Sequence, residues 1–388
     1  MTDDKRKYTI RLFPTPSQTK LLWQYVDARW FVWNWALATL EQWRYEFEIA
    51  HPSEKYKNDW NRLSREFAIL REKTSGLRRL KSHDARSALH DLKIAYQAFF
   101  KRVKKGVKGQ NPKNPFGFPQ PKKRFGKAHG FLVPEGCRIE NRRLIALGVR
   151  LKLARSIPSN GSVGKAVRIT HTAGKWYASF TLDPIKISPQ PVPPVNLAGI
   201  DTGCTIYAAI SDGSEIPNPR WTRQYERKLA HWQRKFCRQK RGSHRRNRIR
   251  QRLAKIHAAI ANRRKHYSHL HSRRVADKYD AVCIETHSIA DQMQARWAKS
   301  IADVGQGHFR QCLKYKLPDR GKQLLCADPK FKSTGVCPEC HCTVDLKLSE
   351  RKWTCPDCGT HHHRDFAAAK VLQHEGRRQV TANEMATT

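Results

Sequence analysis

Acidic residues are scarce in this chain of 388 residues. It has 33 Asp and Glu against 75 Lys and Arg, which gives a formal net charge of +42. A protein this basic repels itself strongly unless it binds a polyanion, so nucleic acid is the expected partner. A membrane surface is the weaker alternative, because the basic residues run along the whole chain rather than beside one apolar anchor.

Long apolar runs are also missing. No stretch of about 18 consecutive apolar residues occurs, so we predict no transmembrane helix. The first residues, Met1 to Lys5, lack the apolar core of a signal peptide. There is no internal repeat and no long low-complexity tract. We therefore expect a cytoplasmic protein without a membrane partner, with room for two or more domains.

The first half of the chain combines alternating runs with helical patterns. Residues 6–13 predict a strand, and the short runs over 131–183 predict a small antiparallel barrel or sheet that pairs with it. Helices are expected from about Ser17 to Phe47 and over 80–104, and 106–130 has the composition of a basic loop. Aromatic residues of the first helix could stack on bases. Their spacing fits a packed core better, and they are Trp23, Tyr25, Trp30, Phe31, Trp33 and Trp35.

A proline-rich segment follows, with five prolines from Pro184 to Pro194, and we take it as the interdomain linker. Further on, residues 223–278 predict a very long basic helix or a helix pair. From Glu226 to Ala276 there are 18 Lys and Arg and one acid. Such a run is usually a solvated face. Here apolar residues at helical spacing, Leu253, Ile256 and Ile260, indicate that one side packs while the other contacts the nucleic-acid backbone.

Three carboxylates stand at the edges of predicted elements. Asp201 and Glu285 each end an apolar run of strand character, and Asp365 opens a helical stretch. Further strands are expected at 205–210 and 323–326, and a helix near 300–316. A parallel or mixed sheet with helices on its faces would bring the carboxylates to one rim. Clustered carboxylates need divalent metal, and two Mg²⁺ would stabilise the attacking and leaving oxygens of phosphodiester displacement.

Each carboxylate alone is a weak signal, because acidic strand ends are common. The order Asp, Glu, Asp on a first strand, a central strand and a late helix is that of an RNase H-like nuclease. Arg364, beside the last carboxylate, could orient a phosphate or be a simple surface arginine.

Four of the eleven cysteines form two CxxC pairs, Cys337 with Cys340 and Cys355 with Cys358. Each pair presents two thiolates to one tetrahedral Zn²⁺, so we predict a structural zinc ribbon in a reducing compartment. A redox pair is the alternative, and it is disfavoured because two pairs occur without a thioredoxin-like context. The histidines at 361–363 could ligate, but a polar turn before the last helix fits them better.

Taken together, these features resemble the TnpB (OrfB) family, the RNA-guided DNA endonucleases of bacterial insertion sequences, which are ancestral to type V CRISPR nucleases. The resemblance covers nearly the whole chain. It is carried by Arg11–Thr15, Phe31–Leu37, Gly199–Gly203, Ile284–Glu285, Lys299–Asp303 with Phe309, Ser333–Cys340, Cys355–Cys358 and Asp365–Ala369. Thr202 stands where the family usually has Leu, and Ala367 where it usually has Asn. Neither is a carboxylate, so we expect cleavage to survive, although Ala367 could slow it.

The resemblance implies an α/β multidomain fold, with a small β-barrel (wedge) and an inserted helical recognition domain followed by an RNase H-like RuvC domain that contains the zinc ribbon. The implied boundaries are 1–16 and 105–184 for the wedge, 17–104 for the recognition domain, 185–195 for the linker, 196–330 and 361–376 for RuvC, 331–360 for the ribbon, and 377–388 for a disordered tail.

The implied activity is hydrolysis of DNA next to a short adjacent motif, guided by an RNA from the end of the transposable element. Asp201, Glu285 and Asp365 would hold two Mg²⁺, and the four cysteines one structural Zn²⁺. We expect one monomer per RNA and association with the nucleoid when on DNA. The alternatives are a non-cutting RNA-guided repressor, a zinc-ribbon nucleic-acid-binding protein without catalysis, and a compact CRISPR effector.

Overall fold

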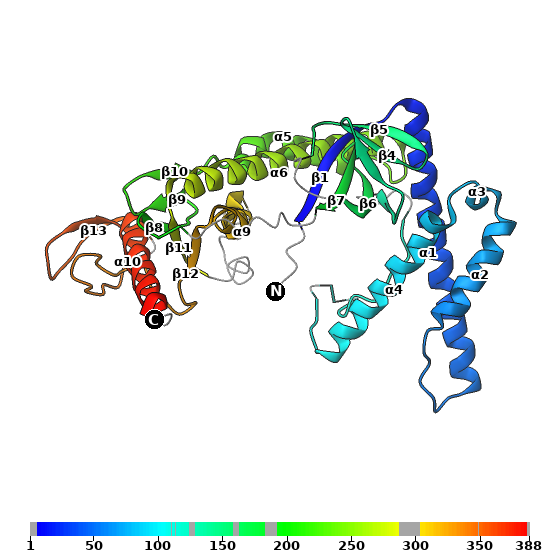
Figure 1. The fold of residues 1–388 in the computed structure, drawn as a ribbon, viewed down its shortest axis with the longest axis horizontal. Helices are drawn as coiled ribbons and strands as arrows, with labels where there is room; N and C mark the ends of the chain where they lie inside the picture. The colour runs from blue at the N-terminus through cyan, green and yellow to red at the C-terminus, as the bar shows by residue number, and fades with distance from the viewer. Residues whose placement is uncertain are drawn as a thin grey trace. The chain divides into compact units, whose positions relative to one another are not determined.

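The computed structural model describes residues 6–109, 111–112, 114–123, 129–157, 163–182, 192–286, 303–347 and 349–385 (Figure 1). The chain divides into two compact units, 1–185 and 186–388. Each unit has its own buried apolar core. Most of the predicted linker, 185–191, and the family motif at 299–302 lie outside the described residues. No helix in the described ranges is long and apolar enough to cross a membrane.

The first unit is built on one antiparallel sheet of seven strands in the order β2-β6-β7-β1-β5-β4-β3. The strands are β1 (Arg6–Phe13), β2 (His129–Val133), β3 (Arg138–Glu140), β4 (Arg143–Ala146), β5 (Val149–Leu153), β6 (Val163–Thr172) and β7 (Lys175–Leu182). The N-terminal strand β1 lies between β7 and β5. This confirms the prediction that the strand at 6–13 pairs with the later strands.

Four helices complete the first unit. They are α1 (Pro16–Ala50), α2 (Trp60–Lys73), α3 (Ser75–Arg78) and α4 (Ser82–Lys104). Helix α1 begins with a capping box between Thr15 and Gln18 and with proline at its first position, which explains its sharp start. The predicted aromatic core is confirmed for Tyr25 and Trp33, which are buried. It is wrong for Phe31, which is 38% exposed.

The second unit contains a five-stranded mixed sheet in the order β10-β9-β8-β11-β12. Its strands are β8 (Leu197–Asp201), β9 (Ile206–Ile210), β10 (Glu215–Pro217), β11 (Ala281–Ile284) and β12 (Gln323–Cys326). Strand β11 is parallel to β8 and to β12, while β9 is antiparallel to β8. The predicted mixed sheet is therefore present, and two strands that end next to acidic residues are neighbours in it.

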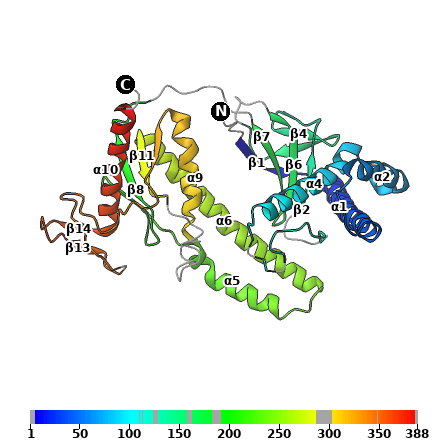
Figure 2. The same ribbon diagram turned by 90° about the horizontal axis from the view of Figure 1, so that it is seen from below.

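The basic segment forms a helix pair, which was one of its two predicted forms. Helix α5 (Trp221–Cys237) and helix α6 (His244–Lys278) pack along each other (Figures 1 and 2). Leu229, Ile256 and Ile260 are buried between them with Leu253 beside them, which confirms the predicted packed side. Of the 18 basic residues, all but Arg246 and Arg264 are exposed.

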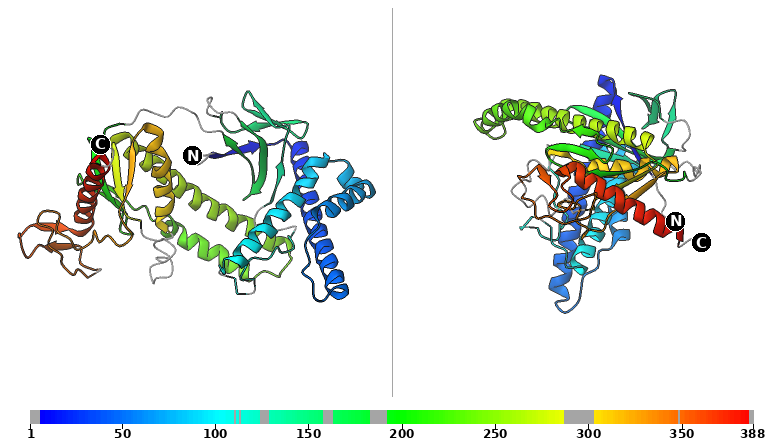
Figure 3. Two further views of the ribbon diagram at one scale, coloured as in Figure 1. Left: turned by 60° about the horizontal axis from the view of Figure 1, so that its bottom comes forward. Right: turned by 90° about the vertical axis from the view of Figure 1, so that its left-hand side faces the viewer.

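Among its described residues, this unit also contains two more helices and a small hairpin. They are α9 (Gln306–Lys316), α10 (Arg364–Met385), the 3-10 turn η1 (Pro318–Arg320), and the strands β13 (Lys352–Thr354) and β14 (His361–His363). Helix α10 crosses the sheet over β8, and the β13–β14 hairpin lies at its N-terminal end (Figure 3).

Two predictions are wrong here. The tail expected to be disordered from residue 377 is helical to Met385, because Glu375 pairs with Arg378 and Gln379 and the partly buried Val380 packs against the sheet. The expected polar turn at 361–363 is strand β14, paired with β13, so the ribbon hairpin extends past residue 360.

Candidate active site and metal centres

Asp201 and Glu285 are neighbours because of strand register. Ile200 lies opposite Ile284 in the parallel pair β8–β11, so the next residue of each chain segment leaves the sheet at the same edge. The residues before them are buried on both faces, as expected for central strands. Both acidic residues are half-buried. The sheet therefore delivers two carboxylates to one edge.

Asp365 reaches this edge because α10 packs unusually close to β8. A Cβ at Gly199 would lie 1.9 Å from the Ala369 carbonyl oxygen and 2.4 Å from the Gln373 nitrogen, so only glycine permits the contact. Gln373 also donates from Nε2 to the Leu197 carbonyl oxygen at 2.7 Å. Asp365 lies in the first turn of the same helix and is 6% exposed.

The three carboxylates interact electrostatically. Burial, together with the negative charges of Glu285 and Asp365, raises the pKa of Asp201 to about 7. The ligand oxygens of the three carboxylates do not all lie within 4.8 Å of one another. Two groups of His, Cys, Asp or Glu among the described residues have ligand atoms within 4.8 Å of one another, and these carboxylates are not one of them.

Two of the three carboxylates, Asp365 and Glu285, accept hydrogen bonds from neighbouring side chains. Arg351 donates from Nη1 to both oxygens of Asp365, at 3.1 and 3.3 Å, and from Nη2 to the Thr205 hydroxyl at 3.0 Å. Arg364 lies 3.4 Å from the same carboxylate. The Ser333 hydroxyl donates to Glu285. The sequence prediction left Arg364 open between a surface role and a site role, and the structure places it at the site.

Two arginines of this site were not predicted. Arg310 on α9 interacts with the charges of Glu285 and Asp201, and its Nη2 lies 3.3 Å from the Thr202 hydroxyl. Arg351 comes from the segment between the two cysteine pairs. A single arginine among 75 basic residues gives no sequence signal, so only the tertiary structure identifies either one.

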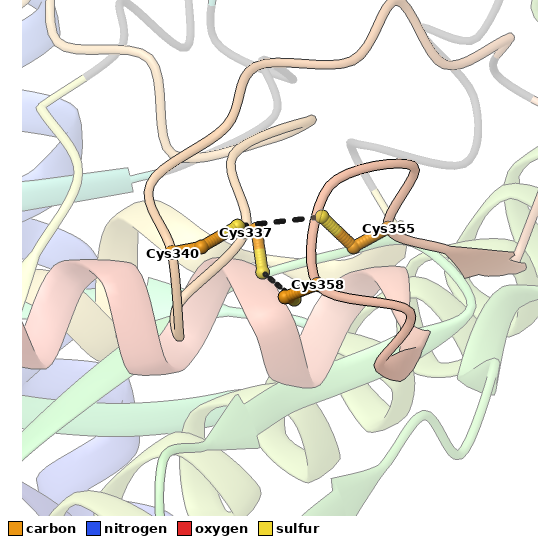
Figure 4. Close-up of side chains that lie close together, drawn as sticks. All are labelled: Cys337, Cys340, Cys355 and Cys358. Atoms are coloured by element: carbon orange, nitrogen blue, oxygen red, sulfur yellow. Dashed lines mark hydrogen bonds between the residues drawn. The ribbon is translucent and has the colours of Figure 1, made fainter.

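The four cysteines converge as predicted (Figure 4). Cys337 Sγ lies 3.7 Å from Cys358 Sγ, and Cys340 Sγ lies 3.4 Å from Cys355 Sγ. Tetrahedral Zn²⁺ with Zn–S bonds of about 2.3 Å requires sulfurs roughly 3.8 Å apart. Hydrogen bonding by Thr360 lowers the pKa of Cys358 to about 6, which favours the thiolate. The cluster can therefore hold a metal ion.

The cysteine cluster also sits directly on the helix that carries Asp365. Cys337, Trp353 and Cys355 form one buried cluster with Ala367 of α10. His362, on β14, is buried, and its Nε2 lies 3.3 Å from Cys337 Sγ. This is the position of an outer hydrogen-bond partner for a thiolate rather than of a solvated turn.

On the α5–α6 pair, some of the basic side chains lie over aromatic rings. Arg252 lies over the Trp232 ring at 4.8 Å, and Arg263 over Trp221 at 5.2 Å and Tyr225 at 5.3 Å. These contacts hold guanidinium groups above apolar side chains while the rest of the face remains basic. Such a surface can bind phosphate backbone.

Three family models match successive parts of the chain. A model described as "Probable transposase", of the IS605 OrfB type, matches residues 179–296, and "Cas12f1-like, TNB domain" matches 307–372. A "Helix-turn-helix domain" model of the OrfB type matches 1–48, which in this structure consists of one strand and a single long helix.

Curated relatives agree with these models. A "Putative RNA-guided DNA endonuclease" of Streptomyces pristinaespiralis is 32% identical over 225 residues, which are 57% of this chain and 55% of that protein. "Putative RNA-guided DNA endonuclease InsQ" of Escherichia coli K12 is 26% identical over 331 residues, 80% of this chain and 79% of that protein. The chain thus spans about half the length of the first relative.

The fold has a solved counterpart. The protein chain in the cryo-EM structure of a Cas12f1–sgRNA–target DNA complex superposes with a TM-score of 0.55 at 13% identity, covering 92% of this chain and 83% of that chain. This identity is too low to transfer function, but the fold is shared over most of both chains. The family models, the relatives and the fold therefore agree that the chain is similar to OrfB-type proteins.

Proposed function

We propose that this protein is an RNA-guided DNA endonuclease of an insertion sequence. It would bind a guide RNA from the end of its element and cleave matched double-stranded DNA beside a short adjacent motif. The observation that carries this proposal is the delivery of Asp201, Glu285 and Asp365 to one edge of the sheet by two parallel strands and one closely packed helix. Both curated relatives described above bear names of the same activity.

The two units then take the roles implied by the family. The first unit would supply the wedge sheet and the helical recognition domain, with boundaries at 1–16, 105–184 and 17–104. The mixed sheet with α9 and α10 would be the RuvC nuclease domain, 196–330 and 361–376, and the cysteine hairpin its zinc ribbon. The adjacent motif would be read by the first unit.

The carboxylates fit divalent magnesium. Burial raises the pKa of Asp201 most and the negative charges of Glu285 and Asp365 add to this, so a hard cation bound to this oxygen ligand would favour its charged form. Asp201, Glu285 and Asp365 would hold two Mg²⁺. When bound, the ions supply activation of water and stabilisation of the leaving 3′ oxygen, giving 5′-phosphate and 3′-hydroxyl ends.

The neighbouring side chains would prepare this site. Ser333 orients Glu285 by hydrogen bonding, and Arg351 fixes Asp365 from the side of the ribbon. The scissile phosphate is negatively charged and must approach three carboxylates of the same sign. Positive charge beside these carboxylates comes from Arg310, Arg351 and Arg364. These guanidinium groups would bind and orient that phosphate.

The cysteine cluster would hold one structural Zn²⁺. Its sulfur spacing fits a tetrahedral ion, and its contact with Ala367 joins the ribbon to α10. The exposed basic face of α5 and α6 would follow the backbone of the guide RNA or of its duplex with DNA. Base pairing would then supply sequence specificity, which suits a protein with much charge and few base-reading side chains.

The test starts with the full chain purified from cells together with the RNA that it retains. That RNA is sequenced, and a matched DNA library is then offered with Mg²⁺ or with a chelator. We expect one co-purifying RNA species and Mg²⁺-dependent cuts at guide-matched sites. Asp201→Ala should abolish cutting and retain the RNA. Glu215→Ala, at an exposed carboxylate of strand β10, is a control that should still cut.

Three other outcomes would contradict the proposal. Cutting by Asp201→Ala at the rate of the unmodified protein would show that these carboxylates are not catalytic. Target binding without cutting would identify a repressor. Heterogeneous RNA without cutting would leave a basic zinc-ribbon nucleic-acid-binding protein.

A further inference from the structure

A second cluster of metal-ligating side chains lies away from the carboxylates, where α6 packs against α9 (Figure 2). It consists of His269 on α6 and of His308 and Cys312 on α9, and the ligand atoms of all three lie within 4.8 Å of one another. His308 and Cys312 are four residues apart, so they project from the same face of their helix. Cys312 is buried, at 2% exposure, and the two histidines are half-buried.

The distances within this cluster fit a tetrahedral ion. Cys312 Sγ lies 3.5 Å from Nδ1 of His269 and 3.5 Å from Nδ1 of His308. Zn–S of about 2.3 Å and Zn–N of about 2.05 Å at the tetrahedral angle require S···N separations of roughly 3.6 Å. The same reasoning applied to the cysteine cluster gave an equally close match. The Cys312 thiol has one proton, so it can donate a hydrogen bond to only one of the two imidazole rings.

We propose that His269, His308 and Cys312 bind one Zn²⁺ that fastens α9 to α6. Two imidazoles and one thiolate are the donors that this borderline ion prefers, and hard ions such as Mg²⁺ do not compete for them. The Tyr315 hydroxyl lies 3.3 Å from Nδ1 of His269, and either this oxygen or water would complete four-coordination. This site is separate from both metal centres of the proposed function and does not depend on them.

The contacts around the cluster show what such an ion would stabilise. Lys316 on α9 donates to the His269 carbonyl oxygen at 2.6 Å and to the Ser272 hydroxyl at 2.8 Å, so the two helices already share a polar seam. Helix α9 also carries Gln306, which donates to the Thr202 carbonyl oxygen at 2.9 Å, and Arg310 beside the carboxylates. An ion at the seam would therefore fix the helix that presents Arg310.

The experiment measures bound zinc per chain by elemental analysis. The full-length protein, with its retained RNA, is dialysed against buffer with excess Mg²⁺, which occupies oxygen-ligand sites. We expect two zinc ions per chain, one from the four cysteines and one from this cluster. Cys312→Ser and His308→Asn should each lower the content to one. Cys237→Ser removes an exposed cysteine of α5 and should leave two.

Cobalt substitution provides the second readout, independent of zinc content and of nuclease activity. In a variant with Cys337, Cys340, Cys355 and Cys358 all replaced by serine, a thiolate-to-Co²⁺ absorption band should remain and should disappear when Cys312→Ser is added. Circular dichroism of each variant establishes that it is folded. Equal zinc content in Cys312→Ser and in the unmodified protein would overturn the proposal and leave a hydrogen-bonded thiol–imidazole cluster.

Discussion

Arg351 shows how a single side chain couples the cysteine hairpin to the candidate active site. It joins both oxygens of Asp365 to the Thr205 hydroxyl through one planar guanidinium group. Arg351→Ala removes charge-assisted hydrogen bonds that together are worth about 1.5–3 kcal/mol at this part-exposed position. If they act in the transition state, DNA cleavage should slow by roughly 10- to 100-fold. Single-turnover cleavage with the retained guide RNA measures this.

The retained RNA and the zinc content should not change in Arg351→Ala, because the cysteines do not depend on this side chain. Lysine at 351 should restore little, since an ammonium group cannot span both partners in one plane. Arg377→Ala, at an exposed position of α10, is the matched control. Equal cleavage by Arg351→Ala and Arg377→Ala would show that the contact is only structural.

At the residue scale, the sequence identifies groups that occur in a recognisable order or spacing. Asp201, Glu285 and the paired cysteines were predicted because each stands at the end of an apolar run or in a CxxC motif. Arg310, Arg351 and the cluster of His269, His308 and Cys312 were not, because their partners are distant in sequence. Neither charge nor composition distinguishes these residues from the many others of their type.

At the element scale, the close crossing of α10 over β8 depends on Gly199. A methyl group there would lie 1.9 Å from a backbone oxygen of α10, which no rotamer change can relieve. Gly199→Ala should therefore destabilise the second unit by about 1–3 kcal/mol or more and shift Asp365 away from Asp201. We expect a lower urea midpoint and loss of cleavage.

The control for this substitution is Gly76→Ala in α3. An added Cβ there has nothing within 4 Å, and alanine favours helix, so stability should rise slightly or stay the same. If Gly199→Ala were as stable and as active as Gly76→Ala, the proposed role of the helix crossing would be wrong.

Asp212 anchors the end of α6 to the β9–β10 turn and gives the second unit an acid-sensitive contact. Partial burial raises the pKa of Asp212, but hydrogen bonds from Lys278, Ser214 and Tyr279 lower it by more. The pKa of Asp212 therefore lies below its usual range. A lowered pKa in the folded state stabilises the fold above the unfolded pKa, near 4. This contribution is lost as pH falls below that value.

Asp212→Asn should therefore cost stability at pH 7 and progressively less toward pH 2. Urea unfolding of both proteins across this range measures the difference, which we expect to be about 1 kcal/mol at neutral pH, because water screens the ion pair at this exposed turn. A difference that stayed constant with pH would mean that the lost contact is not linked to ionisation of Asp212.

Elements with strong apolar periodicity were predicted and weak ones were not. The strands that end at Asp201 and next to Glu285 are buried on both faces. Their residues therefore form continuous apolar runs, which the sequence shows directly. Helix α2 was missed because only Leu63 and Phe67 of its 14 residues are buried. The three-residue strands β13 and β14 were missed because such short pairs are fixed by the surrounding cysteine cluster rather than by their own pattern.

At the scale of the whole molecule, the excess of positive charge must act through surfaces, and the α5–α6 pair is the most concentrated one. Arg245, Arg248 and Lys255 are exposed on α6. If they contact phosphates, replacing all three with Gln should reduce the slope of log K against log salt by about 0.7–0.9 for each lost contact, or roughly 2–3 together. Filter binding of the guide RNA across salt concentrations measures it.

The matched control keeps the three positive charges and exchanges guanidinium and ammonium groups. It carries Arg245→Lys, Arg248→Lys and Lys255→Arg. Because counterion release depends on charge, this variant should retain the slope of the unmodified protein. Stability should be the same in both variants, since exposed basic side chains contribute little to folding. If the neutral variant kept the full slope, the charge on α6 would serve as a solvated face, and phosphate binding would have to be assigned to other basic surfaces of the chain.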